Sequence, residues 1–359
     1  MFHLKRIAVA VSLALFITGC SQDNSEQATA PSEAQVAQNQ EAPVESAVSE
    51  SEKANELFES IFMENVMRSP MYQSYLGIKQ DQDKWDDISE QRQQEDLTLQ
   101  QQQLEQVLAI DVEQLDAQTA LSWKLMKQRL ENGIEDFQWR YYNYPVNQMF
   151  GLHSSVASLL INQHRISDTT DAQAYISRLN GLPALFEQLV ANLNVRAENG
   201  IIAPKFVYPY VISDSQNIIT GAPFDDGEPS TLMADFANKV EALEIEQTQK
   251  DELLNQAKHA LTNSVKPAYE SLIAALTQLE TQADTNDGAW KFPRGDEFFN
   301  NALNRTTTTD LTATEIHQIG KDEVARIHDE MRAIMQQVGF KGTLQEFFVH
   351  MRGNEDFIY

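Results

Sequence analysis

Hydrophobic residues recur three and four positions apart along most of the chain, a spacing typical of amphipathic helices. The first such segment begins near residue 52, where Leu57, Ile61 and Val66 follow this spacing. No segment alternates hydrophobic and polar residues for long enough to require a sheet. We therefore predict an all-α fold of mostly long helices. Short strands are compatible with the sequence at 289–293 or 305–310.

Turn-forming residues and prolines predict where these helices end or bend. The Gln- and Glu-rich segment 88–109 predicts a long exposed helix. Residues 171–199 predict a helix pair divided at Gly181-Leu182-Pro183, because proline lacks the N–H that a helix interior needs. Residues 246–282 predict one very long helix with a kink at Pro267.

The sequence Thr312-Ala-Thr-Glu315 is a capping box, which predicts the start of a helix. Seven hydrophobic residues of this helix predict a face turned toward the core: Ile316, Ile319, Val324, Ile327, Met331, Ile334 and Val338. The preceding threonines 306–309 favour an extended backbone. Their hydroxyls either bind a ligand at the helix N-terminus or belong to a plain connection. A last helix is expected from about Thr343.

The first 20 residues combine a basic start with a short apolar run, which is typical of a secretory signal. The run is too short to span a bilayer comfortably. It ends in Ile17-Thr18-Gly19-Cys20, which resembles the lipobox of bacterial lipoproteins. That resemblance implies cleavage after residue 19 and a lipid on the Cys20 thiol, since a thiolate alkylates readily. The alternative is an ordinary secretory signal with a chance cysteine, but this is the only cysteine of the chain.

The predicted organisation therefore has three parts: a signal peptide over 1–19, a lipidated acidic tether over 20–51 and a helical domain over 52–359. Residues 21–50 contain no Lys, Arg or aromatic residue and are too polar to form a core, so we predict a flexible tether. Ser21 stands where aspartate would resemble the inner-membrane retention signal. We therefore expect a lipid-anchored envelope protein in the outer membrane, facing the periplasm.

The charge balance excludes one large class of partners. The chain carries 53 acidic and 27 basic residues, a net charge of −26. Nucleic-acid binding needs basic groups facing phosphate, so we expect no nucleic-acid partner. The membrane, reached through the lipid on Cys20, is the partner that the sequence predicts.

No catalytic constellation is recognisable in the chain. It has no HExxH metal motif, no GxSxG serine motif and no glycine-rich phosphate loop. His317 and His328 share a helix face but lie eleven residues apart, roughly 16 Å along the axis, too far for one ion. Carboxylate pairs such as Glu315 with Glu323, or Asp225-Asp226, are expected to be surface acids. We therefore predict no catalytic and no metal residue, and no cofactor in this chain.

Four aromatic residues form a cluster that is open to two interpretations. Trp139, Tyr141, Tyr142 and Tyr144 either line a groove or belong to the core, and core packing is the more frequent outcome.

Several segments together resemble the bacterial "domain of unknown function 885" family, from about residue 55 to the end. They include Arg68-Ser-Pro70, Ser74-Tyr75-Leu76-Gly77, Thr170-Asp171-Ala172, Tyr175-Ile-Ser-Arg178-Leu179, Val265-Lys-Pro267-Ala268-Tyr269 and Gly288-Ala-Trp-Lys-Phe-Pro293-Arg-Gly295. No single segment is diagnostic, but their order and spacing are specific.

Members of that family are commonly about half as long again and resemble all-helical gluzincin metallopeptidases. Their C-terminal part carries a His-Glu-x-x-Pro-Gly-His-His signature, in which histidines bind zinc and the glutamate acts as general base. Nothing in this chain matches that signature. The resemblance therefore implies the N-terminal part of a larger helical metallopeptidase-like fold. Zinc and a peptide substrate are expected only of a longer protein.

Two other hypotheses remain open at this point. The chain could be a non-enzymatic binding or scaffold lipoprotein, or a truncated remnant without activity. In all three cases the 359 residues by themselves are expected to be catalytically inert.

Overall fold

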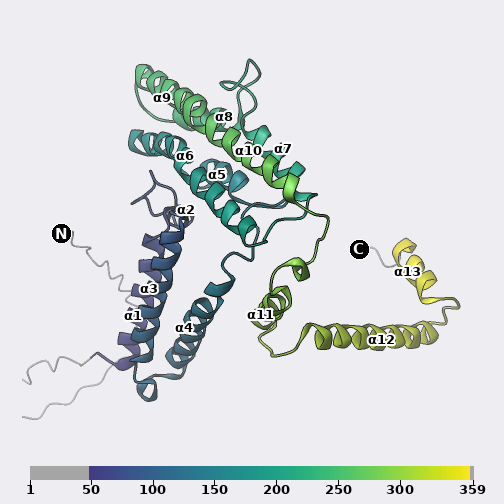
Figure 1. Ribbon diagram of the computed structural model, residues 1–359. Coiled ribbons are helices and arrows are strands. Elements are labelled where there is room, and N and C mark those ends of the chain that lie inside the picture. The colour runs from purple at the N-terminus through teal and green to yellow at the C-terminus, as the bar shows by residue number, and fades with distance from the viewer. Residues whose placement is uncertain (1–47, 356–359) are drawn as a thin grey trace, which may run out of the picture. The chain divides into compact units, whose positions relative to one another are not determined.

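The computed structural model describes residues 48–355, whose regular elements are helices (Figure 1). The described residues form only two isolated β-bridges, Val146 with Gly151 and Ala222 with Pro229. The prediction of an all-α fold is confirmed. None of the helices in this range is both long and apolar enough to cross a bilayer. The predicted signal peptide, Cys20 and nearly all of the predicted tether lie outside the described residues.

The N-terminal helices pack around a small core of their own. They are α1 (Glu50–Met67), α2 (Pro70–Tyr75), α3 (Glu90–Leu108) and α4 (Ala117–Asp136). The side chains of Ile61, Val107 and Leu130 are buried where α1, α3 and α4 meet. The Trp123 indole donates a hydrogen bond to the Val107 carbonyl over 2.7 Å, which fixes α4 against α3.

Six helices form the central bundle, which holds the largest hydrophobic core among the described residues. They are α5 (Leu152–Asn162), α6 (Thr169–Glu198), α7 (Val207–Ile218), α8 (Thr231–Glu241), α9 (Gln247–Ala260) and α10 (Lys266–Gln282). Helix α6 contacts both α9 and α10. Leu182, Leu189 and Tyr269 are fully buried there.

The predicted break at Gly181-Leu182-Pro183 is wrong, because α6 continues through Pro183 as one helix. Proline in a helix interior costs about 3 kcal/mol. Here Leu182 and Phe186, on either side of the proline, lie fully in the core, and their burial offsets that cost. Gly181 also lies against Trp85, where a side-chain carbon would approach the indole to 3.1 Å.

The predicted irregularity near Pro267 is confirmed, although its form differs from a simple kink. Residues Leu261–Val265 make a π-helical turn, and α10 begins directly after it with the proline in its first turn. A proline is tolerated there because the first helical N–H groups have no partner within the helix.

Three further helices, here called the C-terminal helices, complete the described chain. They are α11 (Gly295–Thr307), α12 (Ala313–Gln337) and α13 (Leu344–Gly353). Thr312 caps α12 through the predicted capping box. The last helix begins after Thr343 as expected, and a second capping box there, which was not predicted, closes its N-terminus. Neither of the two ranges considered for short strands forms one. Residues 289–293 hold a short 3₁₀ turn, and 305–310 hold the end of α11.

The threonines 306–309 end a helix, whereas an extended backbone was expected there. The Thr306 and Thr307 hydroxyls donate to the carbonyls of Ala302 and Leu303, one turn earlier, over 2.8 and 2.9 Å. These local bonds satisfy the hydroxyls inside the last turn of α11. Thr308 then adopts a left-handed conformation, with φ of 56°, and closes the helix.

The core face predicted for α12 is largely exposed. Within the described chain α12 makes its main contacts with α11 and α13, and Met335 is its only buried residue. Ile334 is 49% exposed and Val338 65%. The pattern correctly predicted an amphipathic helix, but the described residues supply no neighbour for most of its apolar face.

Candidate functional site

A buried arginine joins the N-terminal helices to the central bundle. Arg178 on α6 is completely buried. Its guanidinium donates to the carbonyls of Lys84 and Pro70, over 2.9 and 3.1 Å, and to the Ser74 hydroxyl over 2.8 Å. The plane of Trp85 lies beside it, and the Trp85 indole donates back to the Arg178 carbonyl over 2.7 Å. These bonds fix the segment after α2 against α6.

His164 extends this polar cluster on the other side of the guanidinium. Arg178 Nη1 lies 3.2 Å from His164 Nδ1, and His164 Nε2 lies 3.0 Å from the Asp171 carbonyl. The guanidinium can only donate, so Nδ1 accepts and Nε2 carries the proton that goes to the carbonyl. Burial lowers the pKa of His164 to about 4, so the ring is neutral at pH 7.

Asp171 anchors the same cluster as an ionised carboxylate. Burial alone opposes its ionisation, but hydrogen bonds from Lys79 and Ser167 outweigh it and lower the pKa of the carboxyl below its usual value. Burial also lowers the pKa of Arg178 to about 10, which leaves it charged at neutral pH. Each group has its partners inside the protein, so this cluster is a structural connection and holds no free acid or base.

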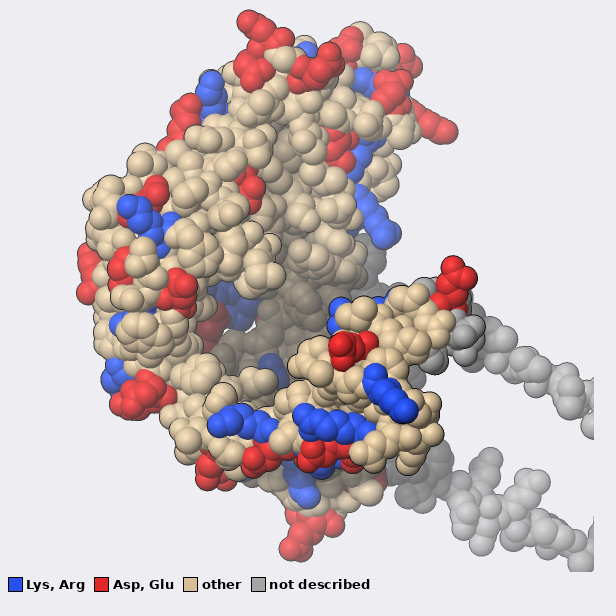
Figure 2. Space-filling view, turned by 90° about the vertical axis from the view of Figure 1, so that its right-hand side faces the viewer, with Lys and Arg blue, Asp and Glu red and all other residues tan. Residues whose placement is uncertain are grey.

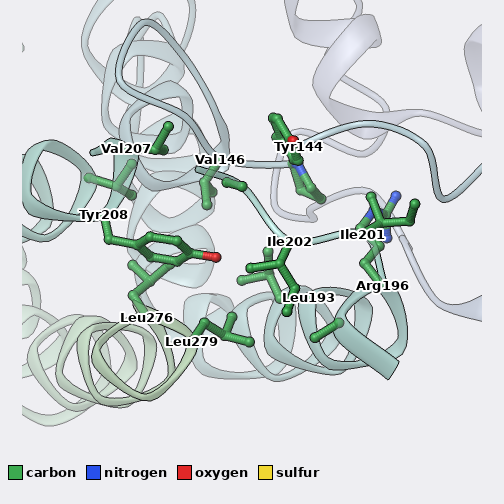
Figure 3. Close-up of a pocket in the computed structure, with 14 residues that line it drawn as sticks. Tyr144, Val146, Leu193, Arg196, Ile201, Ile202, Val207, Tyr208, Leu276 and Leu279 are labelled. Atoms are coloured by element: carbon green, nitrogen blue, oxygen red, sulfur yellow. The ribbon is translucent and has the colours of Figure 1, made fainter. Parts of the chain in front are cut away.

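A small cavity lies in the central bundle, between α6, α7 and α10 (Figure 3). The Tyr208 ring extends toward its middle, with Leu276 and Leu279 on one side. Its volume is about 20 Å³, room for a single water. Burial raises the pKa of both Tyr144 and Tyr208 to about 12. A space of this size cannot take a substrate, so it is a packing defect of the core.

The aromatic cluster near 139–144 is mostly part of the packing. Trp139 is buried and lies edge-on to Tyr142, and both rings contact Phe298 of α11. The Tyr141 hydroxyl donates to Glu90. Tyr144 lines the small cavity. The cluster therefore joins α11 to the helices before it and forms no groove of its own.

An apolar opening in the described chain lies between the starts of α11 and α12. This surface, here called the Trp290 groove, has a volume of about 690 Å³ and includes Trp290, Phe299, Asp296 and Thr314. Trp290 is 71% exposed, an unusual degree for a tryptophan. A volume of this size is in the range of small-molecule and peptide sites.

The groove depends on a glycine that the local backbone requires. A side-chain carbon at Gly295 would lie 2.2 Å from the Ala289 carbonyl oxygen, so only glycine allows α11 to start so close to the preceding turn. Arg294, just before it, has φ of 54°. The family resemblance includes this segment, but no local pattern indicated an exposed tryptophan, because the groove also needs the start of α12.

The histidines and carboxylates considered as catalytic or metal-binding candidates do not come together in one site. Residues 48–355 contain no group of three His, Cys, Asp or Glu side chains placed to hold a metal ion. Glu315 accepts from the Thr312 N–H, and Glu323 pairs with Arg326 over 2.8 Å. Asp225 accepts from the N–H groups of a turn. These carboxylates serve caps, turns and surface pairs, as expected.

Acidic side chains are spread over the visible face in Figure 2 and do not gather in one patch, and large areas carry no charge. The surface therefore offers no concentrated electrostatic site on that side.

Comparison with known proteins gives a family and a fold. A family model described as "Bacterial protein of unknown function (DUF885)" matches residues 70–359. A solved protein of Colwellia psychrerythraea, described as a candidate lipoprotein, is 22% identical with a TM-score of 0.71, over 87% of this chain and 55% of that one. A candidate lipoprotein of unknown function from Shewanella oneidensis is 14% identical with a TM-score of 0.58, over 83% and 50%.

These likenesses show the fold alone, since both identities are low. The chain spans about half the length of each of the two solved relatives. No curated protein matches it.

Proposed function

We propose that this chain, which belongs to the DUF885 family of bacterial proteins of unknown function, is the helical N-terminal portion of a lipid-anchored, zinc-dependent peptidase-like hydrolase. The proposal rests on how much of a solved relative this chain covers: 87% of this chain aligns with 55% of the Colwellia protein. The longer relatives thus have polypeptide beyond the matched part, in which the metal site expected from the family resemblance would lie.

In this proposal the described residues form one wall of the substrate site and contribute no metal ligand. The Trp290 groove is the part of that wall best suited to contact a peptide, because exposed aromatic rings bind apolar side chains. Asp296 at its edge adds an acceptor for a peptide N–H or a basic side chain.

The proposed location is the outer membrane, facing the periplasm, with the lipid on Cys20 as the anchor. The lipobox resemblance supports it, and both solved relatives are described as candidate lipoproteins. Mass spectrometry of the N-terminal peptide from the membrane fraction should show a chain that begins at Cys20 and carries a diacylglycerol on its thiol. An N-terminus elsewhere, or an unmodified Cys20, would contradict the anchor.

The deciding experiment is the intact mass of the native protein from its own cells, followed by zinc analysis and a peptidase assay. A mass above that of residues 20–359, near-stoichiometric zinc and cleavage of peptides are the expected results. A native protein that ends at Tyr359, or a longer one that holds no zinc, would overturn the enzymatic proposal.

A binding or scaffold role is the second candidate, and the exposed Trp290 ring favours it. Such a lipoprotein would bind an apolar ligand in the Trp290 groove without turnover. It requires a native chain that ends at Tyr359 and unfolds in one sharp transition. A broad transition with dye binding would instead indicate an inactive remnant.

A further inference from the structure

Helix α12 carries an apolar seam with the spacing of a coiled coil. Five residues follow one another at intervals of three and four: Val324, Ile327, Met331, Ile334 and Val338. Such a repeat places all five on one narrow stripe of the helix and suits the packing of a single partner helix. From first to last the seam spans roughly 21 Å at 1.5 Å per residue.

Most of this seam has no neighbour in the described chain. Val324 is 53% exposed, and Ile327 and Ile334 are exposed as well. Within residues 48–355 the seam is covered only toward its C-terminal part, where Met331 packs against the cluster of Met335 with Leu344 and Phe347 of α13. A contiguous row of exposed aliphatic side chains on one helix indicates an interaction surface.

A second copy of the same chain is a poor occupant for the seam. Each chain has a net charge of −26, so two copies repel one another. Glu323 and Glu330 flank the seam on one side, and an antiparallel pair of α12 helices would bring these carboxylates opposite their counterparts. Like charges at these flanking positions disfavour such a pair.

We infer that the α12 seam docks one amphipathic helix from the polypeptide that the longer relatives possess beyond the matched half. The inference rests on the proposed function, since it takes the native protein to be longer than this chain. The solved relatives have about as much chain outside the aligned part as within it, enough to supply such a helix. The partner helix is about 15 residues long, with apolar residues facing the seam.

The charges beside the seam determine which residues are expected along the edges of the partner helix. Glu323 and Glu330 both pair with Arg326, over 2.8 and 2.6 Å, and stay largely exposed. Lys or Arg on the partner helix, opposite these two carboxylates, gives pairing across the seam of the kind that selects partners in coiled coils.

The test uses cysteine labelling of the native protein in membranes from its own cells. Ile334→Cys places a thiol in the seam, and Ala333→Cys places one beside it, outside the stripe and exposed. Ile327→Cys and Ala325→Cys form a second such pair. Cys20 is the only natural cysteine, so the unmodified protein gives the background.

If the seam is covered, maleimide labels Ile334→Cys and Ile327→Cys about tenfold more slowly than their neighbours, because labelling requires local opening. Denaturant should abolish the difference. Equal rates in the folded protein would overturn the inference. So would protection in a protein whose intact mass ends at Tyr359, since a second copy or a separate partner would then cover the seam.

This readout is independent of activity. A covered seam in a protein without zinc or peptidase activity would leave the docking inference standing and remove the enzymatic proposal. An exposed seam in an active zinc enzyme would do the reverse.

Discussion

The central bundle and the C-terminal helices have similar amphipathic patterns but different degrees of burial. In α6, Leu182 and Leu189 are completely enclosed by other helices. In α12, Ile334 and Val338 occupy equivalent positions of their apolar stripe and remain 49% and 65% exposed. A periodic pattern therefore identifies the apolar face of a helix, but does not say whether that face is covered within the same 359 residues.

The two regions also differ in how polar groups are used. The bundle encloses Arg178, whose partners at Lys84 and Pro70 lie on segments distant in the sequence. Along α12 the ionic side chains pair with neighbours three or four residues away, as in Arg332 with Asp329. Long-range polar contacts stabilise the arrangement of helices, whereas local pairs stabilise one helix by little.

The comparison can be broken most directly by removing equivalent apolar side chains. Leu182→Ala should lower the free energy of unfolding by about 4 kcal/mol, because it leaves a cavity in a closed core. Ile334→Ala in the same chain of 359 residues should cost less than about 1 kcal/mol, because that side chain is half exposed. Urea unfolding of both variants measures the difference, and similar losses would mean that α12 is covered.

Next in size is the effect of the buried guanidinium. Arg178→Met should cost about 3 kcal/mol or more, because the carbonyls of Lys84 and Pro70 lose their donor inside the protein. Arg332→Met, which removes only an exposed pair, should change stability by less than about 0.5 kcal/mol. Thermal unfolding of the two variants provides the comparison, and equal melting temperatures would contradict it.

A pH dependence should come from His164 in the bundle. Its pKa is about 4 in the folded protein and near 6.5 when unfolded, so the unfolded chain binds the extra proton between these values. Stability should therefore be complete above pH 6.5 and fall by about 3 kcal/mol in total as the pH decreases to 4. His164→Asn should flatten the dependence of urea unfolding on pH in this window. An unchanged slope would show that another group titrates.

The smallest expected effect comes from removing one helix cap in the central bundle and one in the C-terminal helices, and different measurements detect the two losses. Thr312→Ala and Ser230→Ala each remove a helix cap, worth about 1 kcal/mol. Ser230 is buried in the bundle, so its loss should lower global stability. In the chain of 359 residues the seam of α12 is largely exposed, so loss of the Thr312 cap should speed amide exchange in α12 alone. Faster exchange throughout the bundle in Thr312→Ala would indicate that the two regions unfold together.

Much of the fold followed from local signals in the sequence. The capping box at Thr312, the helix start near Thr343 and a helix irregularity close to Pro267 were all predicted near their observed positions. Each depends on interactions within a few residues, which a sequence pattern describes directly. Pro183 misled the prediction because its cost is local, whereas the burial of Leu182 and Phe186 that offsets it is not.

The candidate site was less accessible from the sequence. Tyr175, Arg178 and Leu182 are spaced along one face of α6, so an arginine in an apolar stripe was a signal for a buried cation. Its partners, at Pro70 and Lys84, lie about a hundred residues away. The Trp290 groove likewise combines residues before α11 with the start of α12.

The sequence by itself determined the helical class, the family resemblance and the apolar face of each long helix, because these depend on residue spacing and local hydrogen bonding. Only the tertiary structure decided which faces are covered, which polar groups are enclosed and that Trp290 is exposed. Burial depends on segments that are distant along the chain, and the spacing of residues within one helix carries no information about them.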